Sequence, residues 1–194
     1  RNFIKSSSFK SLKISLFINY MSIKHIITVP DETLKKISEP IEKVGVNEKK
    51  LIKDLFETMY QSKGIGLAAV QVGILKRILV IDVSSKDEKR EPLSFINPSI
   101  KKISDETSVY EEGCLSIPDT FIEIERPKIC EVEYIDINGK IRNMKCDGLL
   151  STCIQHEINH LDGKLIIDHL SKLKRDMIIK KISKSKKNPD RIVV

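Results

Sequence analysis

One five-residue stretch constrains the fold of this chain more than any other, the HEINH at residues 156–160. Residues four apart on a helix lie on one face, one turn above the other, so a helix here would present His156 and His160 side by side. Two imidazoles so placed can bind one metal ion, and the carboxylate of Glu157 can reach a water molecule on that ion. Apolar residues recur around the stretch at helical spacing: Leu150, Ile154, Ile158 and Leu161. The sequence therefore predicts a helix with one buried face beside a metal centre.

The sequence also indicates both ends of this helix. Asp147 precedes the helix and is a plausible N-terminal cap, because its side chain can accept hydrogen bonds from the first turn. Gly163 follows the helix and suits the left-handed conformation that ends many helices. A surface helix with two unrelated histidines is the plainer interpretation of the five residues, and the apolar stripe counts against it.

Length and composition favour one folded domain. The chain has 194 residues, of which 40% are hydrophobic, and this is enough to bury a core. No apolar run approaches the ~20 residues that a membrane-spanning helix needs, so no membrane association is expected. The four cysteines do not suggest a disulfide scaffold in a lysine-rich chain. Reduced thiols suit the cytoplasm, and Cys130 and Cys146, in or beside predicted strands, are expected to be buried.

The net charge of +7 belongs to the two ends of the chain. Residues 1–24 carry five bases and no acid, and residues 172–194 carry nine bases and two acids, so the part between them is net negative. Basic ends are often solvated tails and sometimes contact nucleic acid or ribosomes. Few aromatic residues accompany these charges, so a base-stacking platform is not expected.

The N-terminal extension, residues 1–20, is rich in Ser and Lys and lacks acids. This composition resembles an organelle transit peptide, but it fits translated sequence upstream of Met21 equally well. We therefore exclude residues 1–20 from the fold, and we treat residues 183–194 as a basic C-terminal tail. The chain would be cytoplasmic in a bacterium, or organellar if residues 1–20 are a transit peptide.

Periodicity along the rest of the chain predicts an α+β fold. Helical spacing marks a short stretch near Leu34, residues 47–62 with Asn47 as cap, and a last helix after Ser171. In that last helix the residues expected to face inward are Leu173, Met177, Ile178 and Ile182. Strands are expected at 77–83, near 93–96, 107–110 and 121–125, and at 129–137 and 141–146 around the hairpin signal Asn138-Gly139. This order indicates mostly antiparallel β-sheets wrapped around a central helix, the one carrying HExxH, with an N-terminal and a C-terminal helix.

A catalytic metal site of this kind usually has three protein ligands and one open position, so His156 and His160 need a third partner. Cys153 lies near the same helix face, but three ligands from one straight helix rarely close a tetrahedron, and packing is its expected role. His169 is a candidate, because zincin-like sites often take a later ligand. Cys114 is the stronger candidate, because the glycine before it lets the backbone approach the ion.

Residues 64–73 (GIGLAAVQVG) form a second unusual segment, which is free of charge directly after a charged helix. Its glycines would let an extended substrate lie against the backbone, and Gln71 offers an amide donor. A tightly packed turn is an equally good interpretation. The segment is not a phosphate-binding loop, because it lacks the Gly-Lys-Ser/Thr ending.

Three segments in series resemble the peptide deformylase family: GIGLAAVQ at 64–71, EGCLS at 112–116 and QHEINHLDG at 155–163. The resemblance covers residues 21–182, which would form the catalytic domain. It implies a hydrolase that removes the formyl group from N-formylmethionine at the start of newly made bacterial and organellar proteins and releases formate. The family uses one divalent metal ion, typically Fe2+ in the cell, and often works with Zn2+, Ni2+ or Co2+.

The resemblance also implies a role for each residue around the metal. The ligands would be Cys114, His156 and His160, with a water molecule in the fourth position. Glu157 would be the general base. Gln71 and the backbone N–H of Leu115 would hold the formyl oxygen.

Further positions of the family match its substrate pocket and the supports of its metal site. The methionine pocket would be lined by Ile65, Tyr110, Leu149 and Cys153, and the backbone at Gly66 would contact the peptide. Glu112 and Arg126 match positions whose side chains can pair to hold the Cys114 loop. One residue departs from the family motif, which usually has aspartate where this chain has Asn159. Changes beside metal ligands can cost roughly 10–100-fold in metal affinity or activity, so Asn159 bears on metal affinity but leaves the assignment of the site unchanged.

Two other functions fit part of the sequence. HExxH alone would allow a zincin-like metallopeptidase, but zincins usually take His or Glu as third ligand, and EGCLS counts against it. The basic ends would fit a non-enzymatic RNA- or ribosome-binding protein, whose affinity would fall steeply with salt. The partners implied by the resemblance are formyl-Met nascent peptides. The basic C-terminal helix is either a solvated face or a contact with the ribosome, and no sequence-specific nucleic-acid binding is expected.

Overall fold

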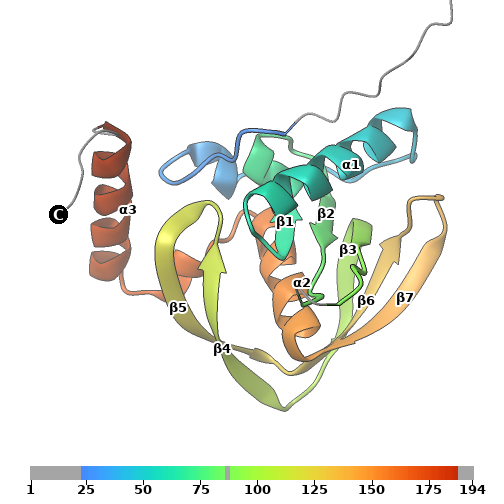
Figure 1. The fold of residues 1–194 in the computed structure, drawn as a ribbon. Helices are drawn as coiled ribbons and strands as arrows, with labels where there is room; N and C mark the ends of the chain where they lie inside the picture. Colours follow the sequence, from blue (N-terminus) through green and yellow to red (C-terminus); the bar gives the residue numbers. More distant parts are fainter. Residues whose placement is uncertain (1–22, 86–87, 188–194) are drawn as a thin grey trace, which may run out of the picture.

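The computed structural model describes residues 23–85 and 88–187, which fold into two antiparallel β-sheets and three α-helices (Figure 1). The α-helices are α1 (Val46–Gln61), α2 (Gly148–Leu161) and α3 (Lys172–Lys187). Short 3-10 helices form η1 (Glu32–Lys35), η2 (Ala69–Val72) and η3 (Ile166–His169). The predicted α+β class, with mostly antiparallel strands around a central helix, is confirmed.

The larger sheet has five strands in the order β1-β2-β3-β6-β7. These strands are β1 (Gly66–Ala68), β2 (Ile78–Ile81), β3 (Leu93–Ile103), β6 (Ile129–Ile135) and β7 (Ile141–Asp147). The smaller sheet pairs β4 (Thr107–Cys114) with β5 (Ile117–Pro127). Helix α2 lies between the two sheets and contacts strands of both (Figure 1).

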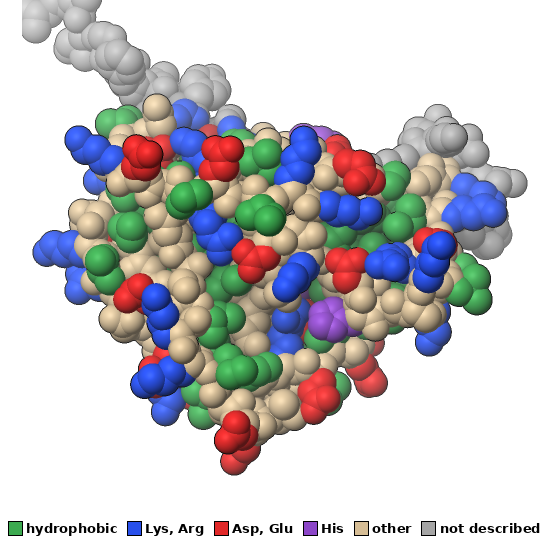
Figure 2. Space-filling view, turned by 180° about the vertical axis from the view of Figure 1, so that it is seen from behind, with side chains coloured by type: hydrophobic (Ala, Val, Ile, Leu, Met, Phe, Trp, Pro, Cys, Tyr) green, Lys and Arg blue, Asp and Glu red, His purple; other side chains and the backbone are tan. Residues whose placement is uncertain are grey.

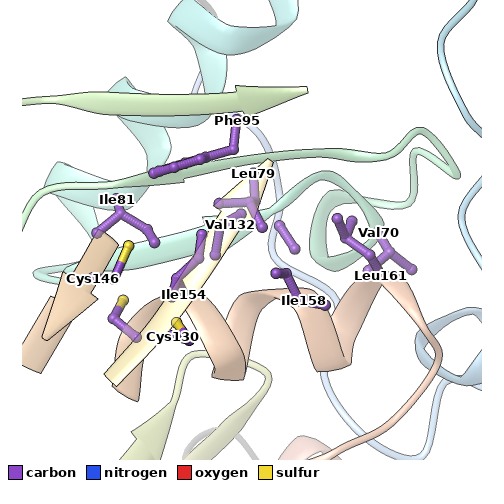
Figure 3. Packing of buried hydrophobic residues seen from close by; sticks show 12 residues of the cluster. Val70, Leu79, Ile81, Phe95, Cys130, Val132, Cys146, Ile154, Ile158 and Leu161 are labelled. Atoms are coloured by element: carbon purple, nitrogen blue, oxygen red, sulfur yellow. The ribbon is translucent and has the colours of Figure 1, made fainter. Parts of the chain in front are cut away.

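The apolar stripe of α2 packs on one face of the larger sheet, as the sequence predicts. Ile154, Ile158 and Leu161 point from the helix toward the sheet (Figure 3). They meet buried side chains from three strands, namely Leu79, Ile81, Phe95 and Val132. Because each fully buried side chain of this size contributes about 1.5–3 kcal/mol, the stripe fixes the rotation of α2 and therefore the direction of its other face.

Helix α1 covers the opposite face of the same sheet. Successive residues of a strand point to opposite faces, so β2 sends Leu79 and Ile81 toward α2 and Ile78 and Val80 toward α1. All four residues are fully buried. This explains why residues 78–81 form a continuous apolar run instead of an alternating one.

Three strands, β3, β4 and β5, extend further than the sequence predicts, and β3 shows how. The sequence predicts a strand near residues 93–96, whereas β3 runs to Ile103. In the structure Asn97 has a φ of 50° and the strand continues through a register shift. The Asn97 side chain accepts a hydrogen bond from the Ile41 N–H and donates one to the Ile41 carbonyl oxygen, both at 2.8 Å.

The helix boundaries and the hairpin largely follow the sequence, but two predicted N-terminal caps differ. Helix α1 begins at Val46 with Gly45 as its cap, so the prediction that Asn47 caps it is wrong. The reason is that the Glu48 carboxylate accepts a hydrogen bond from the Gly45 N–H at 2.9 Å. Asp147 occupies the cap position of α2 without a side-chain capping bond. The hairpin turn between β6 and β7 contains Gly139 with a φ of 79°, as expected.

The sequence predicts the buried face of α3 correctly for two residues and wrongly for two others. Ile182 is buried and Ile178 packs beside it against β5 and η3, but Leu173 and Met177 are 72% and 63% exposed. At 100° per residue, Leu173 lies about 180° and Met177 about 140° from Ile182 around the helix. One narrow stripe therefore holds α3 on the body, and two large apolar side chains point away from it.

The predicted boundaries at the two ends fall partly outside the described residues. Residues 1–20 lie in the part that the structure does not describe, and α3 continues through Lys187, past residue 182. None of the described helices has both the length and the apolar character to cross a membrane. On the face in Figure 2, basic and acidic side chains are intermingled and do not form a field of one sign.

Candidate metal centre and active site

Three metal-binding side chains converge between α2 and the end of β4. The Nε2 atoms of His156 and His160 are 3.2 Å apart, and Cys114 Sγ lies 3.2 Å from His160 Nε2. Tetrahedral coordination with metal–nitrogen bonds of about 2.0–2.1 Å places two nitrogens ~3.3 Å apart. The spacing of the two imidazoles therefore fits one shared ion, and this set is the one metal-type cluster found among the described residues.

The other candidates for the third ligand lie elsewhere. His169 is exposed at the end of η3 and does not belong to the cluster. Cys153 is buried, with its Sγ 3.8 Å from the carbonyl oxygen of Ile65, which agrees with a packing role. All four cysteines are free thiols, and Cys130 and Cys146 are buried opposite each other on β6 and β7, as expected.

A buried carboxylate orients the first histidine. Glu112 Oε2 lies 2.8 Å from His156 Nδ1, so the other ring nitrogen of His156 faces the cluster. Arg126 donates to both oxygens of Glu112. Burial alone would raise the pKa of Glu112, but the hydrogen bonds from His156 and Arg126 and the Arg126 charge outweigh it and lower the pKa. Glu112 is therefore ionised and holds the imidazole in one tautomer.

Glu157 lies on α2 beside the cluster and is almost fully buried. Its Oε2 has no hydrogen-bond partner among the described residues. Burial is the main cause that raises the pKa of Glu157 to about 7. A carboxylate with this pKa can both take and give a proton near neutral pH.

The space that Glu157 occupies depends on a glycine in β1. A Cβ atom added at Gly66 would lie 2.4 Å from Glu157 Oε1 and 2.8 Å from Cys153 Sγ. Both distances are too short for any side chain. Gly66 is therefore required for the close approach of β1 to α2. The sequence alone assigned this glycine only the role of contacting the peptide through its backbone.

The Gln71 side chain points at the same centre from η2. Its Oε1 accepts a hydrogen bond from the Ala68 N–H at 2.8 Å, which fixes the orientation of the amide. Its Nε2 lies 3.2 Å from Ser116 Oγ and 3.7 Å from Cys114 Sγ. Ser116 was not among the residues singled out from the sequence, although it is the last residue of the EGCLS segment.

A cavity of 440 Å³ opens beside the cluster and is lined by residues from both sheets and α2. It brings together all the residues expected to contact the substrate: Ile65, Gly66, Tyr110, Leu149 and Cys153. Gln71, Cys114, Leu115, His156 and Glu157 line it as well. A cavity of this size accepts a side chain and a few backbone atoms.

Two supporting contacts were only partly visible in the sequence. The pairing of Glu112 with Arg126 is confirmed, but the contact of Glu112 with His156 was not anticipated. Arg126 also donates to Asn159 Oδ1 at 2.8 Å. The sequence contained a sign of these contacts in the inward–outward alternation of residues along β4 and β5. Glu112 and Arg126 take inward positions, where a charged residue needs a buried partner.

Known proteins of one family match most of the chain. The family model for polypeptide deformylase matches residues 23–176. A peptide deformylase of Pelagibacter ubique is 59% identical over 174 residues, covering 90% of this chain and 100% of the relative. One of Rhizobium meliloti is 52% identical over 167 residues, covering 86% and 96%. A crystal structure of peptide deformylase from Ehrlichia chaffeensis superposes with a TM-score of 0.82 at 45% identity, covering 87% of this chain and 99% of that one.

Proposed function

Because this chain belongs to the peptide deformylase family, we propose that Cys114, His156 and His160 bind the metal ion of its deformylase reaction. The family removes the formyl group from N-formylmethionine at the start of nascent proteins, and it depends on a metal ion. The observation that carries the proposal is the convergence of one sulfur and two Nε2 atoms, all within 4.8 Å of one another.

The donor set supports one divalent ion of the first transition row. A thiolate and two imidazoles suit Fe2+, Zn2+, Co2+ and Ni2+ alike, and we take Fe2+ as the ion in the cell, as in the family. A divalent ion bound there would act as a Lewis acid and lower the pKa of a bound water molecule to about 7. A thiolate ligand would also make the site sensitive to oxidation.

Glu157 is the proposed general base. It would accept a proton from the attacking water molecule and later donate it to the amine that leaves. Its raised pKa and its unpartnered Oε2 both support this role. The carboxylate needs no rearrangement to accept the proton, because no described residue competes for that oxygen.

The formyl oxygen would be held by two donors, the Gln71 Nε2 and the Leu115 N–H. The Gln71 amide is held in one orientation by Ala68 and Ser116, so its N–H groups are positioned before the substrate arrives. Losing one such donor typically costs ~10²–10³-fold in rate. Leu115 follows Cys114 directly, which places its backbone N–H beside the proposed metal ligand.

The formylmethionine side chain would enter the apolar part of the cavity. Ile65, Tyr110, Leu149 and Cys153 would contact it, and burying a methionine side chain contributes about 1.5–3 kcal/mol. Strand β1 lies at the edge of its sheet. Its unpaired side can therefore hydrogen-bond an extended peptide near Gly66.

Anaerobic purification followed by metal analysis and a formate-release assay tests this proposal. We expect one ion per chain and release of formate from formyl-Met-Ala. Full metal occupancy in a Cys114→Ala variant would exclude Cys114 as a ligand. A zincin-like metallopeptidase would instead cleave casein, and its later histidine ligand is not supported by the exposed position of His169.

A ribosome contact through α3 is a second proposal. Leu173 and Met177 are exposed on this helix, which is rich in lysine, so the helix offers both apolar and basic groups to a ribosome. Replacing both residues by Glu leaves the packed Ile178 and Ile182 in place. Sedimentation with ribosomes should fall in this variant, and equal sedimentation would refute the contact. The bacterial relatives also favour a cytoplasmic setting for such an encounter.

A further inference from the structure

A closed path of hydrogen bonds begins and ends on α2. Asn159 Oδ1 accepts from Arg126 Nη1 at 2.8 Å, and Arg126 holds both oxygens of Glu112. Glu112 in turn contacts His156 Nδ1 at 2.8 Å. The path links Asn159 to a proposed metal ligand one turn earlier on the same helix, through β5 and β4.

The charges along this path cancel in this chain. Arg126 and Glu112 are each 6% exposed, and Glu112 is the one carboxylate that pairs with Arg126 among the described residues. Asn159 contributes an uncharged amide oxygen to the same guanidinium. An aspartate has nearly the same shape, but it would add a negative charge to a pair that is now neutral.

Such a charge would reach the metal site by two routes. Arg126 would be shared between two carboxylates, which would leave more negative charge on Glu112 and a more electron-rich His156. The added charge would also attract a divalent ion directly, and because residue 159 is half-buried, solvent screens this attraction only in part.

We propose that Asn159 acts through Arg126 and Glu112 to weaken the hold of the Cys114, His156 and His160 site on its divalent ion, relative to aspartate at the same position. Asn159 is therefore a positioning residue that also sets the charge of the cluster. This inference rests on the proposed function, because it assumes that these three residues bind the ion.

The test compares Zn2+ affinity between the purified protein and its Asn159→Asp variant, by competition with a chromophoric chelator. We expect the variant to bind Zn2+ about tenfold more tightly, the lower end of the range for residues that support metal ligands. Asn159→Ala removes the hydrogen bond to Arg126 without adding charge, and it should bind Zn2+ more weakly than the unchanged protein. Equal or weaker binding by Asn159→Asp would overturn the inference.

A matched control adds the same charge far from the site. Asn138→Asp changes an exposed residue of the β6–β7 turn, where Asp-Gly is as suitable as Asn-Gly, and it should leave Zn2+ affinity unchanged. A tenfold gain in this control as well would mean that net charge alone is responsible, which also overturns the inference.

The design separates this inference from the proposed function. If the unchanged protein and Cys114→Ala bind Zn2+ equally, the proposed site itself is wrong. If Cys114→Ala loses Zn2+ but Asn159→Asp does not differ from the unchanged protein, only the role of Asn159 is wrong. The absorption spectrum of the Co2+ form gives a readout besides activity, because it reports on ligand geometry that a loss of stability alone would not change.

Discussion

Adding a single methyl group at Gly66 should disable the general base while leaving the metal ligands in place. The new Cβ of Gly66→Ala would lie 2.4 Å from Glu157 Oε1, whereas an ordinary contact needs about 3.4 Å or more. Glu157 or β1 must therefore move by about 1 Å. A displacement of this size at a catalytic group can cost about 10²-fold in rate, and crowding a packed interior costs about 1–3 kcal/mol of stability.

The assay is formate release from formyl-Met-Ala, with metal content and thermal unfolding measured on the same samples. We expect kcat/KM to fall about 10²-fold in Gly66→Ala, with metal content unchanged, because the atoms nearest to the new methyl group belong to Glu157 and Cys153 and not to a proposed ligand. Gly45→Ala is the matched control, since Gly45 has an ordinary negative φ and its added Cβ would meet only the end of the Glu48 side chain, at 3.2 Å. If Gly66→Ala is folded and within twofold of the control, the close approach does not determine the position of Glu157.

Three further predictions concern the site, and a fourth concerns Tyr60 of α1, whose hydroxyl donates a hydrogen bond to Asp82 at 2.6 Å. Glu157→Ala should retain its metal ion and lose nearly all formate release, and an active variant would refute the base assignment. Cys114→Ala should lose metal by elemental analysis. Glu112→Gln removes the charge that balances buried Arg126 and should lower the free energy of unfolding in urea by about 3–5 kcal/mol. A urea unfolding midpoint equal to that of the unchanged protein would contradict this. Burial, and next the hydrogen bond to Asp82, raises the pKa of Tyr60 to about 12. The stability that this shift contributes is present below pH ~10 and is lost as the pH rises toward 12. Between pH ~10 and ~12 the Tm of Tyr60→Phe should therefore fall less than the Tm of the unchanged protein.

The parts of the fold that the sequence predicts well are those specified by neighbours in the chain. The stripe Ile154, Ile158 and Leu161 depends only on helical spacing, and the turn at Gly139 depends on two residues with suitable backbone conformations. Both are present as predicted.

The parts that the sequence could not supply depend on distant contacts. The continuation of β3 past Asn97 depends on the backbone of Ile41, which is far away in the sequence. The exposure of Leu173 and Met177 depends on how narrow the surface beneath α3 is. No local pattern contains that information, since the same spacing would suit a helix buried on a wider face.

The site shows the same division, and it explains why two sheets are needed. Helix spacing places His156 and His160 on one face of α2, one turn apart, whereas a strand would separate residues four apart by about 13 Å. Strand spacing places Glu112 and Cys114 on one face of β4, two residues apart, where one contacts His156 and the other His160. Shifting β4 by one residue would turn both side chains away together. Glu112 pairs with Ile122 in the regular register of β4 and β5, and Cys114 follows a register shift after Gly113. The orientation of one histidine therefore depends on this register, and the position of the third donor to the ion depends also on the shift that follows it.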